Sequence, residues 1–196
     1  MPDDATALET PVLLVAMPQV LDPFFHKSVV LLIHQSEEGS FGLIINRRTD
    51  IHVSEILNGM EITWLGDRDA LALFGGPVQS QLGTVLFDPG PGKRIATEAS
   101  SEILQGVMIT QHVGDLSKLA GSPPGAFRLY LGYAGWGAGQ LIEEILRNDW
   151  LTALVTTDLI FAADPDRVWS DALKAVGVDP LLLPSWTQSG GGDSAN

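Results

Sequence analysis

The chain has 196 residues, of which 45% are hydrophobic, and it carries a formal net charge of −13 and no cysteine. This composition suffices for one packed core, excludes disulfides, thiolate catalysis and sulfur-ligated metals, and disfavours nucleic acid as a partner, because phosphates repel an acidic surface. Apolar runs stay well short of the ~20 residues that span a membrane, and the acidic start lacks the layout of a signal peptide, so we expect a cytoplasmic protein without membrane contact.

The two ends of the chain differ in composition from the part between them. Residues 1–10 are polar and predict a flexible N-terminus. The stretch 187–196 is rich in Gly and Ser, which bury too little apolar surface to offset their ordering entropy, so it predicts a disordered tail. No linker or fixed-period repeat interrupts the rest, and residues 11–186 are therefore expected to form a single domain.

The N-terminal half is dominated by short, continuously apolar runs of the kind that form buried strands. Strands are predicted over 12–17, 28–34, 41–46, 70–74 and 83–87. A glycine-containing loop at 36–40 separates the second run from the third, which predicts a β-hairpin. Residues 53–60 are expected to form a short helix.

The C-terminal half alternates less regularly between strands and helices. Strands are predicted over 106–110, 127–135, 151–157 and 159–162, and short helices over 115–120 and 139–148. In the second of these helices, Glu143 and Arg147 lie four residues apart, an order that favours an ion pair worth ~0.3 kcal/mol.

The last helix has the clearest signals. Asp164 can cap it, Pro165 suits its first turn and Gly177 ends it. Its apolar stripe consists of Val168, Trp169, Ala172, Leu173 and Val176. Since strands outnumber helices without strict alternation, the chain is expected to be an α+β protein: a single compact unit with a mixed, largely antiparallel sheet and a few packed helices.

The segment LGYAGWGAGQ contains glycines at 132, 135, 137 and 139, between a predicted strand and a predicted helix. Such an element could bind an anion with its exposed amides. The glycines do not follow the dinucleotide-binding spacing, however, and no lysine is present to make a phosphate loop. The favoured interpretation is that small residues let the strand and helix backbones pack closely, with anion binding as the alternative.

Three blocks of the sequence resemble the YqgE/AlgH family of bacterial proteins. They are GYAGWGAGQLIEEI, MPQVLDPFFHKSVVLLIHQSEEGSFGLIINR and FGGPVQSQLGTVLF, which together span most of residues 14–155. The resemblance implies an α+β fold, a cytoplasmic location and no established enzymatic activity. Members are often labelled transcriptional regulators by association with control of an exopolysaccharide pathway.

Two positions depart from the family pattern. Members often have Pro where this chain has Arg48, and His where it has Phe87. The second departure leans against a shared catalysis that depends on histidine.

The four histidines, His26, His34, His52 and His112, show no zinc-binding spacing. His34 ends a strand and is expected to be partly buried and hydrogen-bonded. His112 and Asp115 could orient a general base, but a turn capped by Asp115 is the favoured interpretation. The sequence therefore nominates no catalytic residue, metal ligand or cofactor.

Residues around the family-like turns are the candidates for contact with a ligand or partner. Some lie near the predicted hairpin and could form a pocket rim, and the others lie at turns where backbone amides are accessible. They are Asp22, Pro23, Phe24, Ser28, Gly75, Gly76, Tyr133, Gly135, Trp136 and Gly137.

The favoured function is that of a non-catalytic regulatory or protein-interaction protein with an unknown protein partner. The alternative is a small-molecule-binding protein or an unassigned enzyme that uses the glycine-rich turns. That alternative requires one pocket shared by Tyr133, Trp136, Gly75 and Gly76. Direct binding to DNA is disfavoured by the charge.

Overall fold

A computed structural model describes residues 8–93, 95, 97–162 and 164–184. Ten strands are present in these ranges: β1 Val12–Ala16, β2 Val29–Ser36, β3 Gly39–Ile44, β4 Arg48–His52, β5 Leu71–Phe74, β6 Val78–Asp88, β7 Ser101–Leu104, β8 Val107–Thr110, β9 Ala126–Gly137 and β10 Trp150–Ala153. The helices are α1 Val53–Gly59, α2 Val113–Gly121, α3 Gln140–Leu146, the π-helix η1 Asp158–Ala162, α4 Pro165–Ala175 and the 3-10 helix η2 Pro180–Leu182.

The strands form one curled sheet whose main path runs β10-β1-β2-β3-β9-β6-β8-β7, and β4 and β5 branch from it beside β9. Among the pairings between the described strands, β5 with β9 is parallel and the others are antiparallel. The prediction of an α+β fold with a mixed, largely antiparallel sheet in a single compact unit is confirmed.

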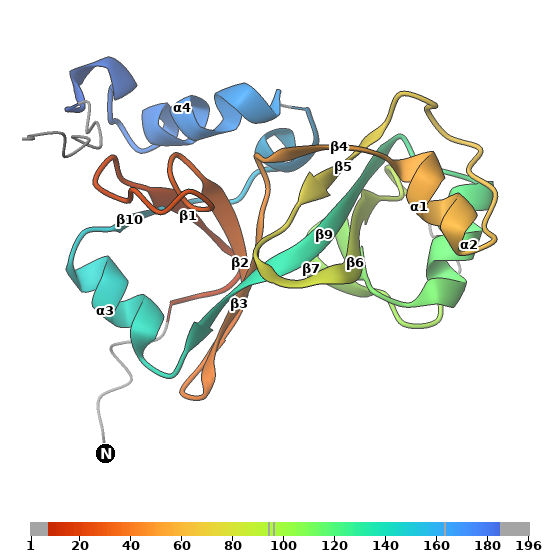
Figure 1. The fold of residues 1–196 in the computed structure, drawn as a ribbon, viewed down its shortest axis with the longest axis horizontal. Helices are drawn as coiled ribbons and strands as arrows, with labels where there is room; N and C mark the ends of the chain where they lie inside the picture. The colour runs from red at the N-terminus through yellow and green to blue at the C-terminus, as the bar shows by residue number, and fades with distance from the viewer. Residues whose placement is uncertain (1–7, 94, 96, 163, 185–196) are drawn as a thin grey trace, which may run out of the picture.

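Strand β9 joins the two halves of the sheet. In Figure 1 it crosses the middle of the molecule, with β1, β2 and β3 on one side and β6 and β7 on the other. Its first part pairs with β6 from Asp88↔Ala126 to Val78↔Tyr133, and its last part pairs with β3 from Gly42↔Ala134 to Gly39↔Gly137. The β5 strand lies parallel to it at Leu73↔Tyr130.

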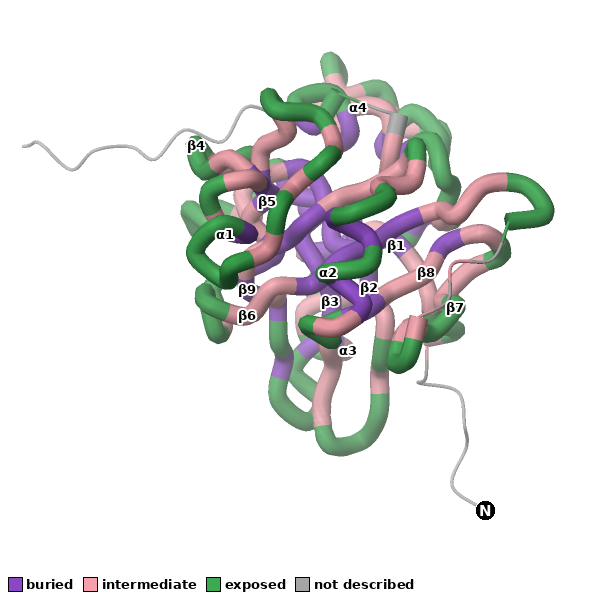
Figure 2. The backbone as a smooth tube through the Cα atoms, turned by 90° about the vertical axis from the view of Figure 1, so that its right-hand side faces the viewer, coloured by how far each residue is buried: buried purple, intermediate pink, exposed green. Residues whose placement is uncertain are grey.

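The continuous apolar runs at the N-terminus are explained by burial on both faces of the sheet. In β1, Leu13 and Val15 contribute to a core covered by α4, whereas Leu14 and Ala16 face a second core covered by α3. Because successive side chains of a strand point to opposite faces, a strand covered on both sides is apolar at every position. Figure 2 shows the buried backbone concentrated where β1, β2, β3 and β9 meet.

A third core lies where α1 and α2 pack on the sheet formed by β5, β6 and β9. Val53 and Leu57 enter it from α1, and Leu119 enters it from α2. Phe87, at the position where family members often have His, is 1% exposed in this core. The side chain at this position therefore packs in the interior and does not face a solvent-accessible site.

The predicted elements are present with two exceptions. The strand predicted over 151–157 ends at Ala153, and the strand predicted over 159–162 is wrong because this segment forms the π-helix η1. Strands β4 and β7 were not predicted. The flexible N-terminus expected over 1–10 lies outside the described residues as far as residue 7, and the disordered tail expected over 187–196 lies entirely outside them.

The helices are short. The longest one, α4, has 11 residues. None of the helices in the described part of the chain has both the length and the apolar composition required to cross a lipid bilayer.

Candidate functional site

Most of the glycine run lies within a strand. The strand predicted over 127–135 extends to Gly137, so residues 136–137, which were expected in a loop, belong to β9. Gly132, Gly135 and Gly137 all lie within β9, and only Gly139 stands at the start of α3, with φ +73°. Gly132 is the unusual member, because it lies in a strand with φ +69°. A left-handed residue inside a strand bends it, and here the bend falls where β9 passes from pairing with β6 to pairing with β3.

Close backbone packing is present, but its partner is the loop after β5, not the helix. A Cβ atom added to Gly132 would lie 2.3 Å from the carbonyl oxygen of Gly76. Cβ atoms added to Gly75 and Gly76 would lie 2.3 Å from the carbonyl oxygen of Gly132 and 2.1 Å from the carbonyl carbon of Tyr133. Carbon atoms do not approach this closely, so the three glycines allow the two backbones to touch.

The end of the glycine run is occupied by side chains of α3. The Gly137 N–H donates to Oε1 of Gln140 at 3.1 Å. The carboxylate of Glu144 accepts hydrogen bonds from the indole N–H groups of Trp136 and Trp150, at 2.9 and 2.8 Å, and from Nε2 of Gln140 at 2.9 Å. The amide of Gly137, one of the donors that the anion alternative required, is therefore already bound by Gln140.

Arg147 also differs from its predicted role. Its guanidinium pairs with Asp149 at 2.8 Å, and its predicted pairing with Glu143 does not form.

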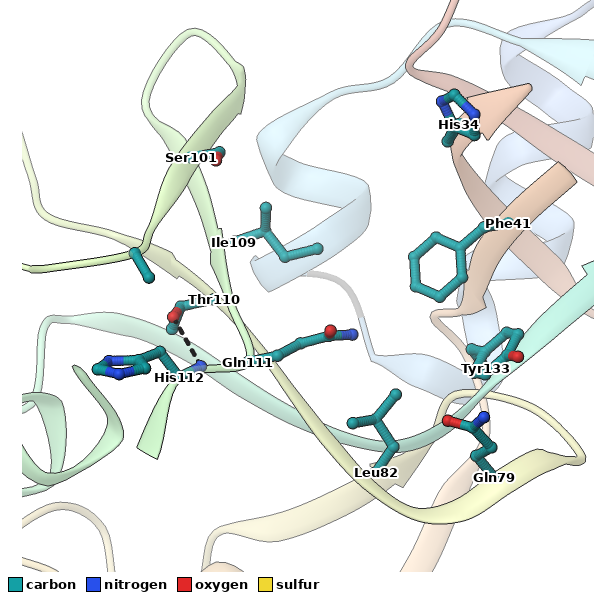
Figure 3. A pocket seen from close by; sticks show the side chains of 11 residues that line it. His34, Phe41, Gln79, Leu82, Ser101, Ile109, Thr110, Gln111, His112 and Tyr133 are labelled. Carbon is teal, nitrogen blue, oxygen red and sulfur yellow. Dashed lines mark hydrogen bonds between the residues drawn. The ribbon is translucent and has the colours of Figure 1, made fainter. Parts of the chain in front are cut away.

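An open pocket lies between the two halves of the sheet, and we call it the Tyr133 pocket. It has a volume of about 720 Å³ and is lined by His34, Phe41, Gln79, Leu82, Ala99, Ser101, Ile109, Thr110, Gln111, His112 and Tyr133. In Figure 3, Phe41 and Tyr133 form one wall and Ile109, Thr110 and Gln111 face them from the opposite side. The two rings lie 5.0 Å apart between centroids.

Besides aromatic, aliphatic and amide side chains, the lining of the Tyr133 pocket contains serine and threonine hydroxyls and the imidazoles of His34 and His112, and it has no carboxylate, lysine or arginine. Both glutamines of the lining, Gln79 and Gln111, are exposed, and Gln79 has φ +47° in the irregular part of β6. Amide groups can donate to and accept from a peptide backbone, and the rings can pack against apolar side chains. The pocket is therefore suited to an uncharged, partly apolar ligand segment.

Asp115 is fully buried at the edge of this pocket and holds three elements together. Its carboxylate accepts hydrogen bonds from the backbone N–H of Glu98 at 2.6 Å and of Ala99 at 3.0 Å, and from the hydroxyl of Thr110 at 3.1 Å. Burial raises the pKa of Asp115, but the hydrogen bonds from Glu98, Ala99 and Thr110 and the nearby His112 outweigh it and lower the pKa below its ordinary value. Asp115 is thus an ionised structural group.

His112 and Asp115 do not form a catalytic pair. The Nδ1 atom of His112 lies 3.8 Å from Oδ1 of Asp115, which is too long for a hydrogen bond. Asp115 was expected to cap the turn that it lies in. Instead it lies in the first turn of α2, and its carboxylate accepts hydrogen bonds from the backbone of residues 98–99. His34 is exposed and donates no hydrogen bond to another described residue, contrary to its expected partial burial.

The predicted contact residues are dispersed. Tyr133 lines the Tyr133 pocket. Asp22, Gly135 and Trp136 line a different pocket of about 360 Å³ beside α3. Pro23 and Phe24 line a third, of about 270 Å³.

The remaining contact candidates do not open into these pockets. Gly75, Gly76 and Ser28 are buried, and Gly137 is exposed outside the lining of all three pockets. Tyr133, Trp136, Gly75 and Gly76 therefore do not share the single pocket that the enzyme alternative required. No group of three or more His, Asp or Glu side chains within the described ranges is arranged to hold a metal ion.

Sequence reasoning missed most of the Tyr133 pocket. In the sequence, Phe41 and Ile109 were recognisable only as members of predicted strands. Gln79 and Gln111 belonged to no pattern that indicates a binding site. The pocket is formed by segments from β2, β3, β6, β7, β8 and β9, whose proximity depends on the order of strands in the sheet. The aromatic residues on the neighbouring strands, Phe41 and Tyr133, were the available signal.

Comparisons with known proteins agree on one family. A family model described as AlgH-like matches residues 13–181. A UPF0301 protein of Myxococcus xanthus is 36% identical over 174 residues, which cover 88% of this chain and 93% of that protein. A UPF0301 protein of Ruegeria pomeroyi is 39% identical over 174 residues, with 87% and 93% covered.

Two solved structures share the fold. The solution structure of the AlgH protein from Pseudomonas aeruginosa matches with a TM-score of 0.72 and 31% identity, covering 88% of this chain and 93% of that one. A crystal structure of a protein from Corynebacterium diphtheriae matches with a TM-score of 0.69 and 24% identity over 84% and 85% of the two chains. The second likeness concerns the fold alone.

Proposed function

Since the chain belongs to the AlgH-like family, we propose that it is a non-catalytic regulatory or protein-interaction protein that binds an uncharged, partly apolar segment of a protein partner in the Tyr133 pocket. The observation that carries this proposal is the pocket itself, with its aromatic wall, its amide side chains and its lack of charged carboxylate, lysine or arginine groups. The cytoplasmic location implied by the family resemblance belongs to the same proposal.

The chemistry at the edge of the pocket supports binding over catalysis. A histidine that acts as a general base is commonly oriented by a third group within hydrogen-bond reach. The carboxylate nearest to His112 belongs to Asp115, and both of its oxygens are engaged by Glu98, Ala99 and Thr110. The fold thus uses this carboxylate to fix the segment at 98–99 against β8 and α2.

The alternative of an enzyme built on the glycine-rich turns has lost its geometric basis. It depended on a pocket shared by Tyr133, Trp136 and the glycines at 75 and 76, and these residues lie in different places. The positions of these glycines therefore give no support to an enzymatic role.

A peptide-display selection tests the proposal. A random peptide library is panned against the wild-type protein, and bound peptides are then compared on Ile109→Glu, which places a charge in the pocket, and on Leu154→Glu. Leu154 is 86% exposed and lies outside the pocket lining, so it is the matched control. We expect peptides with apolar and uncharged residues that bind wild type and Leu154→Glu but bind Ile109→Glu at least tenfold more weakly.

Two results would contradict the proposal. One is a selection whose peptides bind Ile109→Glu as well as wild type, which would place the binding surface elsewhere. The other is chemical conversion of a selected peptide during incubation with the wild-type protein, detected by mass spectrometry, because a non-catalytic binder leaves its ligand unchanged.

A further inference from the structure

A second, smaller pocket shares no lining residue with the Tyr133 pocket, and we call it the Arg47–Arg48 pocket. Its volume is about 270 Å³, and it is lined by Pro23, Phe24, Arg47, Arg48, Thr49 and Phe74. These residues come from the segment between β1 and β2, from the junction of β3 and β4, and from the end of β5.

The charge of this pocket is opposite to the charge of the chain. Two of its six lining residues are arginines and none is acidic, although the chain has 24 acidic and 11 basic residues. Arg47 is held in place by a hydrogen bond from its Nη2 atom to the carbonyl oxygen of His26. The side chain of Arg48 is 48% exposed and so remains accessible to a ligand.

An aromatic surface stands beside the two guanidinium groups. The rings of Phe24 and Phe74 are stacked with centroids 5.7 Å apart and an angle of 25° between their planes. Phe24 is 47% exposed, so part of its ring is accessible to a ligand. A planar ligand group could extend this stack, because offset stacking of rings is favourable.

We propose that the Arg47–Arg48 pocket binds a small anion that carries a planar ring, such as an aryl phosphate or an aryl carboxylate. The planar guanidinium forks of the arginines match the geometry of phosphate and carboxylate oxygens, and the exposed ring of Phe24 receives the apolar part. The volume of about 270 Å³ has room for roughly one ring and one anionic group.

Asp164 is the internal competitor for this anion. Its Oδ1 atom lies 2.5 Å from Nη2 of Arg48, and both side chains are about half exposed. Asp164 also accepts the N–H of Asp166 and so caps α4. The pKa of Asp164 is lowered by that N–H and then by Arg48, so at neutral pH an ionised carboxylate already faces Arg48. A bound anion has to share Arg48 with it or displace it.

This competition gives two variants with opposite expected effects. Arg48→Gln removes one guanidinium, and because the side chain is half exposed the fold should tolerate it. Asp164→Asn removes the competing charge and keeps a good helix cap, since Asn caps as well as Asp. Lys174→Gln changes an exposed charge on α4 outside the pocket lining and serves as the control.

Isothermal titration calorimetry of the full chain measures the affinity for phenyl phosphate, benzoate, inorganic phosphate and benzyl alcohol. We expect phenyl phosphate and benzoate to bind with dissociation constants of about 1 mM, as is typical of ligands this small. Binding should weaken at least threefold in Arg48→Gln and in Phe24→Ala, strengthen at least threefold in Asp164→Asn and stay unchanged in Lys174→Gln. Circular dichroism verifies that each variant is folded.

The remaining outcomes overturn the proposal. Equal binding of inorganic phosphate and phenyl phosphate would remove the role of the ring, and equal binding of benzyl alcohol would remove the role of the charge. If neither aryl anion binds, or if Arg48→Gln and Asp164→Asn leave binding unchanged, the Arg47–Arg48 pocket is not an anion-binding site. None of these results bears on the Tyr133 pocket.

Discussion

Gly132 combines two constraints that no other residue type satisfies together. Its backbone has φ +69°, a region that side chains disfavour. The space where a Cβ atom would lie is filled by the carbonyl oxygens of Gly76 and Val78, at 2.3 and 2.9 Å. Gly132 is therefore one of the three glycines, with Gly75 and Gly76, that let the loop after β5 approach β9 this closely.

Gly132→Ala should lower the free energy of unfolding by about 3 kcal/mol or more, because it adds a steric clash to the backbone cost. Gly139→Ala is the matched control. Gly139 has a similar φ of +73°, but no atom lies within 4 Å of its added Cβ, so about 1 kcal/mol is expected from the backbone alone. Urea denaturation followed by circular dichroism measures both, and equal losses would contradict the close contact.

Asp115 makes the stability of the protein depend on pH. Because its folded pKa is lowered from the ordinary value of 3.8, its carboxylate stabilises the fold above that pH, and the stabilisation is lost as pH falls through the folded pKa. Asp115→Asn replaces one accepting oxygen with a donor that faces the N–H groups of 98–99. We expect a loss of about 2–4 kcal/mol at neutral pH.

The same comparison tests the titration. The difference in unfolding free energy between wild type and Asp115→Asn should shrink as pH falls from about 6 to about 2, since protonation removes the advantage of the carboxylate. A difference that is independent of pH over this range would show that Asp115 is not ionised in the fold.

At the scale of single residues, sequence reasoning identified positions better than roles. His112 and Asp115 were singled out together, but the bonds of Asp115 go to 98–99, a segment that is distant in sequence. Arg147 pairs with Asp149 instead of Glu143, since the end of α3 brings the nearer acid within reach. Such choices between partners depend on coordinates that local spacing does not contain.

Among the elements, α4 was predicted almost to the residue because all its signals are local. The side chain of Asp164 caps the helix, Pro165 opens it, and Val168, Ala172 and Leu173 are buried as the stripe indicated. Trp169 is only partly buried, and Val176, which was assigned to the stripe, lies just after the helix and is exposed. Periodicity, caps and terminators agree within one short window, and such agreement makes a helix predictable.

The strand β9 and the helix η1 show where local signals fail. Glycine normally weakens a strand, so the predicted strand ended at Gly135 with a loop after it, yet β9 continues to Gly137, where it pairs with Gly39 of β3. The apolar segment at 159–162 reads equally as strand or buried helix over so few residues, and packing against the α4 core makes it a π-helix.

The docking of α3 depends on Glu144. Its carboxylate connects α3 to Trp136 of β9 and Trp150 of β10. Glu144→Ala should lower the free energy of unfolding by about 1–3 kcal/mol, because two buried indole N–H groups lose their acceptor. Glu143→Ala, one residue away and exposed, should change it by less than about 0.5 kcal/mol.

Denaturation midpoints measure both variants, and tryptophan fluorescence gives a second readout. Glu144→Ala should shift the emission to longer wavelength as water reaches the indoles. Similar midpoints and identical spectra for Glu144→Ala and Glu143→Ala would contradict the role assigned to the carboxylate.

For the whole molecule, the fold class and the family were accessible from sequence, whereas the arrangement of strands was not. The α+β class followed from counting elements, and the three family-like blocks indicated the family that the comparisons confirm. The Tyr133 pocket depends on which strands are neighbours, and pairings such as Val78↔Tyr133 join residues more than fifty positions apart. Local patterns do not encode such pairings.

The overall charge leads to a prediction about nucleic acid. With a net charge of −13, the molecule should bind duplex DNA negligibly at physiological salt, since affinity for the phosphate backbone requires clustered basic residues. An electrophoretic mobility-shift assay with a pool of bacterial promoter fragments measures this. Tight, sequence-selective retention of a fragment would contradict the expectation.

During translation, β9 is synthesised late. Its residues, 126–137, are made after β3, β5 and β6. Each of those strands therefore has an unpaired edge until β9 has been synthesised. Synthesis from the end of β6 to the start of β9 takes about 2–8 s at ~5–20 residues per second. Unpaired edges invite pairing with other chains. The growing polypeptide is therefore most exposed to aggregation during this interval, and a truncated chain that stops before residue 126 never leaves it.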